Sequence, residues 1–167
     1  MNRTRIARFL ANPGVLRNLY GDVPDLNGVR IRSVNLNWRG PTVTLRVDLP
    51  YPTSAPAEWA DAGMDTVQCQ LEFVAVEGVS LVEWDPPVVG DVEMVPLGAE
   101  RRMRVTVRGR GTVLELVCNE SVVVRHVSAF KAGSDGADSG PHLFVSKVDA
   151  RLYPSVPGTD SKVFHER

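Results

Sequence analysis

Apolar and polar residues alternate at every second position through most of the chain after Val29, and this period predicts β-strands. In residues 42–49 the apolar face consists of Val43, Leu45, Val47 and Leu49. In residues 67–75 it consists of Val67, Cys69, Leu71, Phe73 and Ala75. Residues expected in the core are Val43, Leu45, Val47, Leu71 and Phe73.

The segment 29–38 changes phase partway along. Its apolar residues stand at 29 and 31, and then at 34, 36 and 38. This shift predicts a β-bulge near Arg32 and Ser33. Further strand-like runs are 79–84, 91–95, 102–108, 112–118, 121–128 and 143–153. Short strands separated by turns at this spacing are typical of a sandwich or barrel.

The first 21 residues follow a helical pattern instead. Apolar residues at 6, 9 and 10 have helical spacing. A second short helix is predicted with Asn12 as its N-cap, Pro13 at its first position and Gly21 at its left-handed end. The predicted fold class is therefore mainly β, an antiparallel sandwich or partly closed barrel with short N-terminal helices.

The length of 167 residues fits one domain. We expect a single β-rich domain over residues 1–154 and a C-terminal tail over 155–167. Residues 132–141 contain three glycines and no bulky apolar side chain, so we expect a mobile surface loop. Residues 51–64, which contain several prolines, also have the composition of a loop.

Composition narrows the function classes. The formal net charge of −1 gives no general reason to bind nucleic acid or a membrane. The sequence contains neither an apolar run long enough to span a bilayer nor the apolar stretch of a secretory signal, so we expect a cytoplasmic protein. Cys69 and Cys118 lie in strand-like segments without metal-ligand spacing, and we interpret each as a small buried residue.

The charges are strongly segregated along the chain. Residues 47–100 contain 11 acidic residues and no Lys or Arg, whereas residues 1–46 have a net charge of +6 and residues 101–131 of +5. One interpretation is that acidic and basic strands are neighbours and their charges pair across strands. The other is that part of the acidic block forms a patch for a basic partner. The arginine-rich strand at 101–110 lacks the interleaved aromatic residues that stack on bases, so nucleic-acid binding is not expected.

The sequence offers no convincing catalytic or metal-binding motif. It has no glycine-rich phosphate loop and no nucleophile elbow, and His126, His142 and His165 lack metal-ligand spacing. We therefore expect no enzyme activity, no metal and no cofactor. Two alternatives stay open: a small-ligand-binding β-barrel or sandwich module, which would need a concave apolar pocket, and, more weakly, a hydrolase with dispersed carboxylates.

An ordered series of landmarks spans residues 12–130. It consists of Asn12-Pro13-Gly14, Tyr20-Gly21-x-x-Pro24-x-Leu26, Gly40-Pro41-Thr42 with the alternating strand after it, Pro56-x-x-Trp59 with the second strand, and Ser128-Ala129-Phe130. In this order the landmarks resemble the family-50 immunity proteins of actinobacteria. The resemblance implies an immunity protein of a polymorphic toxin system, which binds a cognate toxin domain and neutralises it by occlusion. It supplies no catalytic residues.

Candidate partner-binding residues come from the loop after Pro56. Glu58, Asp61 and Asp65 surround Trp59 there, in a stretch whose side chains are freer to face a partner than those on paired strands. We expect Trp59 to be partly exposed as an anchor, and the acids to steer a basic toxin. The alternative is that Trp59 closes one end of the core and the acids keep its loop soluble. The oligomeric state is left open.

Overall fold

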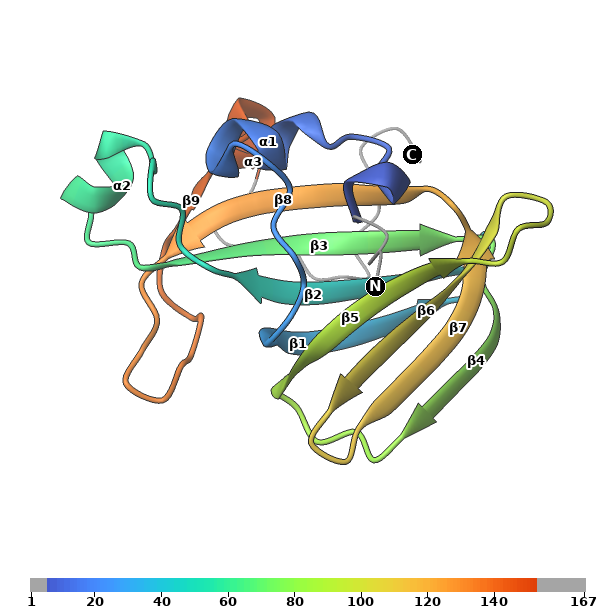
Figure 1. The fold of residues 1–167 in the computed structure, drawn as a ribbon. Coiled ribbons are helices and arrows are strands. Elements are labelled where there is room, and N and C mark those ends of the chain that lie inside the picture. Colours follow the sequence, from blue (N-terminus) through green and yellow to red (C-terminus); the bar gives the residue numbers. More distant parts are fainter. Residues whose placement is uncertain (1–5, 153–167) are drawn as a thin grey trace.

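The computed structural model describes residues 6–152. Within this range the strands form one nine-stranded antiparallel sheet in the order β4-β7-β6-β5-β1-β2-β3-β8-β9 (Figure 1). The strands are β1 (Val29–Asn37), β2 (Thr42–Leu49), β3 (Thr66–Val74), β4 (Glu77–Val82), β5 (Val88–Pro96), β6 (Arg102–Gly109), β7 (Val113–Asn119), β8 (Val122–Phe130) and β9 (His142–Phe144). The predicted mainly β, antiparallel class is confirmed.

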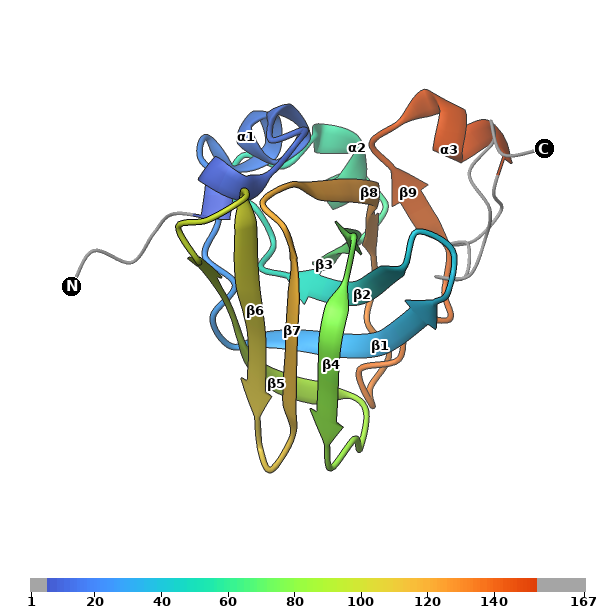
Figure 2. The same ribbon diagram turned by 90° about the vertical axis from the view of Figure 1, so that its right-hand side faces the viewer.

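The sheet bends over itself, so that β6, β7 and β4 lie in front of β1 and β2 in Figure 2. One bend lies in β1, where the register with β2 shifts between Ile31 and Ser33, as the change of phase predicted. The other lies between β3 and β4, at Ala75, whose φ is 51°. Among the described residues β4 and β9 are the two edges, so this sandwich-like sheet does not close into a barrel.

The apolar side of the bent sheet, here called the inner face, encloses the core. Cross-strand partners such as Leu45 and Leu71 share this face. The five residues predicted for the core are all buried: Val43, Leu45, Val47, Leu71 and Phe73 are at most 2% exposed. Cys69 and Cys118 are buried free cysteines, as predicted. Burial raises the pKa of each thiol to about 12.

The N-terminal segment covers one end of this core. The 3₁₀ helix η1 (Ile6–Phe9) and helix α1 (Gly14–Tyr20) bury Phe9, Leu16 and Leu19. Gly21 ends α1 with a φ of 80°, as predicted. The predicted N-cap is wrong: Asn12 does not cap α1, because its side-chain amide bonds both backbone groups of Val124 on β8, at 2.7 and 2.8 Å.

Two further helices were not predicted. Helix α2 (Ala57–Asp61) lies within the proline-containing segment that was interpreted as a loop. Helix α3 (Lys147–Leu152) replaces most of the strand predicted at 143–153, of which only β9 is present. Ser146 explains the change, because its Oγ accepts a hydrogen bond from the backbone N–H of Asp149 at 3.4 Å, as an N-cap does.

Candidate partner-binding surfaces

Trp59 belongs to the core. Its side chain is 2% exposed, and its ring centroid lies 6.3 Å from that of Tyr51. The expectation of a partly exposed Trp59 is wrong, because α2 turns this indole inward, where it closes one end of the inner face. A buried indole cannot anchor a partner without opening the core.

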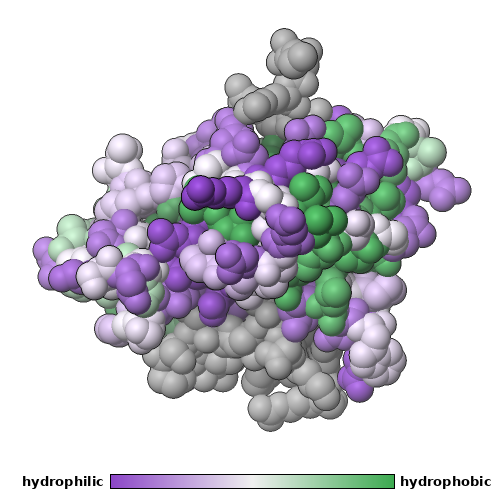
Figure 3. All heavy atoms as spheres, turned by 90° about the horizontal axis from the view of Figure 1, so that it is seen from below, coloured by the Kyte–Doolittle hydropathy of each residue, from purple (hydrophilic) through white to green (hydrophobic). Residues whose placement is uncertain are grey.

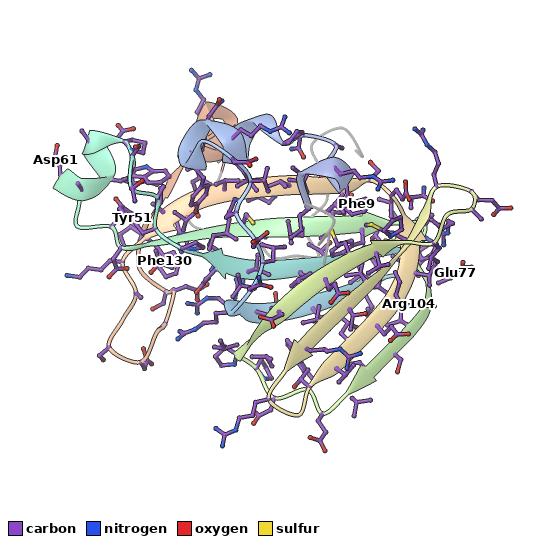
Figure 4. All side chains as sticks on the ribbon, in the orientation of Figure 1. Phe9, Tyr51, Asp61, Glu77, Arg104 and Phe130 are labelled. Carbon is purple, nitrogen blue, oxygen red and sulfur yellow. The ribbon has the colours of Figure 1, made fainter. Side chains whose placement is uncertain are left out.

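The three acids predicted beside Trp59 do not share one environment. Glu58 and Asp61 are exposed on α2, and Figure 4 shows Asp61 at the periphery of the molecule. Asp65 instead fixes the chain after β8, because its Oδ1 accepts hydrogen bonds of 2.9 Å from the backbone N–H of Ala132 and from the Thr66 hydroxyl. These hydrogen bonds lower the pKa of Asp65. All three acids are exposed, and Asp65 differs only in that its carboxylate also holds the backbone of Ala132.

Some acidic residues of 47–100 pair with basic strands and others are exposed, so each of the two interpretations of this block holds for part of it. Three of its members pair with basic strand residues: Asp48 with Arg32, Glu72 with Arg125, and Glu77 with Arg102. Others, such as Glu58 and Glu93, are exposed. The arginine-rich strand is β6, where Arg104 lies 3.6 Å from Glu115 of β7. Cross-strand pairing thus accounts for part of the pattern and leaves a set of exposed acids.

A polar cluster lies on the outer face, the side of the sheet opposite the core, beneath the loop between β8 and β9. We call it the loop-covered cluster; its members are Arg32, Asp48, Gln68, Asp138 and His142. Arg32 donates to both carboxylate oxygens of Asp48, with a shortest distance of 2.6 Å. Gln68 Nε2 donates to Asp48 at 3.1 Å and to Asp138 at 2.9 Å. Arg32 and Arg46 each lie 3.6 Å from the Asp138 carboxylate as well, so the loop is held by side chains on β1, β2 and β3.

Backbone and ring contacts complete the attachment of this loop. Arg30 and Arg32 both donate to the carbonyl oxygen of Gly136, at 3.1 and 2.6 Å. His142 Nε2 lies 3.0 Å from the carbonyl oxygen of Asp138, which can only accept, so Nε2 carries the proton. The guanidinium of Arg32 also lies over the Phe130 ring, 5.4 Å from its centroid. The loop was predicted to be mobile because it lacks apolar side chains, but polar contacts supply the attachment.

The electrostatics of the cluster indicate a structural role. Burial opposes ionisation of Asp138, but the hydrogen bond from Gln68 and the charges of Arg46 and Arg32 outweigh it and lower the pKa. The pKa of Arg32 is raised, because its hydrogen bond and ion pair with Asp48 outweigh burial. Asp138 is thus a stable anion, whereas a general acid needs a raised pKa. Asp138 holds the loop directly, and Asp48 binds Arg32, which donates to the loop carbonyl of Gly136.

The register of β8 with β3 also shifts, opposite Gln68 and Gln70, and His126 has a φ of 51° at this bulge. A shallow depression of about 410 Å³ lies beside it. Its lining combines apolar residues with charged ones, and His126 Nδ1 lies 3.0 Å from Asp149 Oδ1 in it. Val145 on its rim is 39% exposed, so the depression is not the enclosed apolar pocket that a ligand-binding module needs. Among residues 6–152 no group of His, Cys, Asp or Glu side chains is arranged to hold a metal ion.

Comparison with known proteins gives the family. The model of the family described as immunity protein 50 matches residues 12–129, which is more than two thirds of the chain. The chain belongs to the immunity protein 50 family. No curated protein and no solved structure matches it. The matched region runs from the start of α1 through almost all of β8, so it contains both halves of the bent sheet.

Several features of this immunity protein 50 member lie outside the matched region. They are the loop after β8, β9 and α3, which together supply Asp138, His142 and Asp149. The loop-covered cluster therefore joins family residues such as Arg32 and Gln68 to a segment beyond the family model. In the described part of the chain, no helix is long and apolar enough to cross a membrane.

Apolar side chains are exposed on this family member as well as buried. Seen from below, they gather on one side of the molecule, while hydrophilic side chains dominate the other (Figure 3). Trp38, in the turn after β1, is 82% exposed and Leu36 is 59% exposed, whereas β4 contributes exposed Val79, Leu81 and Val82. The sequence showed these residues only as parts of strands, because alternation alone does not reveal which strand is an edge.

Proposed function

We propose that this chain binds a cognate toxin domain and neutralises it by occlusion, without catalysis. The observation that carries the proposal is the family match over residues 12–129, which covers α1 and the strands from β1 through almost all of β8. Membership implies an immunity protein, and such a protein acts by binding the toxin made in the same cell. The encounter would take place in the cytoplasm of that cell.

The size of the molecule is sufficient for this task. A protein interface of standard size buries about 800 Å² on each partner. The accessible surface of the chain is 9653 Å², so such an interface would occupy less than a tenth of it. A rigid antiparallel sheet loses little conformational entropy on binding, which favours tight association.

The exposed acids on α2 are proposed to steer a basic toxin toward the chain. Glu58 and Asp61 are both exposed on α2, and Figure 4 shows Asp61 at the opposite end of the molecule from Arg104 of β6. Rim charges of this kind act on the association rate rather than on the lifetime of a complex. Of the other residues of the same predicted surface, Trp59 is buried, and the exposed Asp65 also holds the backbone of Ala132.

The test is neutralisation of the toxin domain encoded beside this gene. That domain is expressed with and without the chain, and cell growth is measured. Growth should be rescued only when the chain is present, and the purified proteins should form a complex of one chain with one toxin domain. Continued killing in the presence of the folded chain would overturn the proposal.

A further inference from the structure

We propose that β4 (Glu77–Val82) is a docking edge, to which an extended segment of the toxin adds as a further strand of the sheet. This inference rests on the proposed function and names the surface through which it acts. Strand addition is one of the recurrent modes of peptide recognition. The reasons for assigning it to β4 are its free edge, its apolar surroundings and its charge.

The free edge is the first reason. Among the described residues β4 pairs only with β7 and ends the strand order, and each of its six residues is exposed. In an antiparallel edge strand, half of the backbone N–H and C=O groups point away from the only neighbour. The opposite edge, β9, has only three residues and offers a much shorter template.

The edge of β4 also lacks most of the usual protection. Edge strands are commonly guarded by lysine, proline or a bulge. β4 contains neither Lys nor Pro. Its irregularity lies between Glu77 and Ser80, at the start of the strand, and Ser80–Val82 continue in regular register opposite β7. The second half of the strand is therefore open to pairing.

Apolar side chains would receive an added strand. Leu81, which pairs with the core residue Leu114 on the inner face, is 38% exposed, and Val79 is 40% exposed. The hairpin of β1 and β2 continues past β4 in Figure 2, and it carries the exposed Leu36 on its inner face. Alternate apolar side chains of a strand placed beside β4 would therefore meet an apolar floor.

The turn of this hairpin adds the residue types that dominate protein interfaces. Trp38 is 82% exposed, and the guanidinium of Arg39 lies 5.1 Å from its ring centroid. Tryptophan and arginine are enriched among the residues that contribute most to binding. Trp38 therefore has the exposed position that was predicted for Trp59.

Charge then specifies the kind of segment. Glu83 and Asp85 follow β4 directly, both are exposed, and neither forms an ion pair with another described residue. Thr112 Oγ1 donates to the carbonyl oxygen of Glu83, which fixes the chain at this point. The toxin segment should therefore be extended and apolar at alternate positions, with basic residues at the end that lies beside Glu83 and Asp85.

The same charges disfavour a second copy of this chain as the occupant. A second β4 strand contains neither Lys nor Arg, so it offers no basic residue to pair with the exposed Glu83 and Asp85. A basic strand of the toxin would supply such residues. The proposal therefore commits to the toxin.

The experiment compares two double variants of the whole chain. Val79→Lys/Leu81→Lys places charge on the docking edge, and Val89→Lys/Val95→Lys makes the same charge change at exposed positions of β5. The probe is the inactivated toxin domain encoded beside this gene, and affinity is measured by calorimetry. The edge variant should bind at least about ten-fold more weakly than the matched control, the loss expected when central interface residues fail.

Amide exchange on the wild-type complex gives a second measurement, which does not depend on how the variant folds. Amides of β4 should become protected when toxin is added. Equal affinity of the two variants, or no added protection in β4, would overturn the docking edge and leave the proposed function in place. Self-association of the wild type that the edge variant abolishes would also overturn it, in favour of a second copy. Absence of any wild-type binding would instead contradict the proposed function.

Discussion

Asp138, in the loop after β8, accepts a hydrogen bond of 2.9 Å from the side-chain amide of Gln68 on β3. The two residues are 70 positions apart in the sequence. This contact connects a segment of loop composition with the outer face of the central sheet. Gln68 is fully buried, although it alternates with the apolar face of its strand and therefore lies on the opposite side from the core.

The first prediction concerns this attachment. Asp138→Ala should increase amide exchange within 132–141 by about ten-fold or more, because it removes hydrogen bonds to a charged group. Ser134→Ala, an exposed change in the same loop, should leave exchange unaltered. If the wild-type loop already exchanges freely, the composition-based prediction of a mobile loop is correct and these contacts do not persist in solution.

Acid should release the same loop. The folded pKa of Asp138 lies below its ordinary value of 3.8, so the unfolded state binds the proton more readily. The stabilisation by Asp138 is therefore fully present above pH 3.8 and is lost as the pH falls through the folded pKa. Exchange in the loop, measured through this range, should rise in the wild type but not in Asp138→Asn. Identical profiles would show that another group controls the loop.

His142 should titrate below its ordinary pKa. Burial lowers the pKa from 6.5, although the Asp138 carbonyl and nearby carboxylates partly oppose the shift. Because the unfolded state takes up the proton first, the contribution of His142 to stability is present above pH 6.5 and falls as the pH drops toward the folded pKa. NMR titration of the imidazole checks this directly, and a pKa of 6.5 or higher would contradict it.

The core assignment predicts a large loss of stability. Leu45 is 0% exposed at the centre of the inner face, so Leu45→Ala should reduce the free energy of unfolding by about 2–5 kcal/mol. Val95→Ala, at a 43% exposed position of β5, should change it by no more than about 0.5 kcal/mol. Denaturant unfolding measures both, and a loss under about 0.5 kcal/mol for Leu45→Ala would show that this face is not the core.

The exposed acids of α2 should affect how quickly the toxin binds. Glu58→Gln/Asp61→Asn leaves Asp65 and its hydrogen bonds intact, so the fold should keep its thermal stability. The association rate with the toxin should fall at low salt, and the difference should shrink at high salt, because salt screens exposed charges. Stopped-flow association provides the measurement. An unchanged association rate at low salt would show that Glu58 and Asp61 do not steer the toxin.

Local patterns predicted much of the fold. Alternation identified the core of β2 and β3, and the change of phase identified the bulge in β1. Features that depend on tertiary contacts were missed. Asn12 has the sequence context of an N-cap, but β8 lies close enough for its side-chain amide to bond to the backbone of Val124 instead. Trp59 follows a proline in a polar stretch, and only the docking of α2 shows that its indole enters the core.

The partner-facing surface was the least predictable part. Whether a strand is central or an edge depends on the order of strands in the sheet, so the sequence of β4 alone did not distinguish it from β5. The loop-covered cluster combines residues from four strands and a glycine-rich loop, which share no local motif. Segregated charge allowed either cross-strand pairs or an exposed acidic patch, and Asp48 with Arg32 is one pair that formed.

The most direct test of the central claim is the stoichiometry of neutralisation. A fixed amount of the active toxin domain is titrated with the folded chain, and the remaining toxin activity is measured. Occlusion predicts that activity falls in proportion to the added chain and disappears at one chain per toxin domain, with full activity recovered when the complex is dissociated. Complete and irreversible loss of activity at a small fraction of one equivalent, or undiminished activity with the chain in excess, would contradict neutralisation by occlusion.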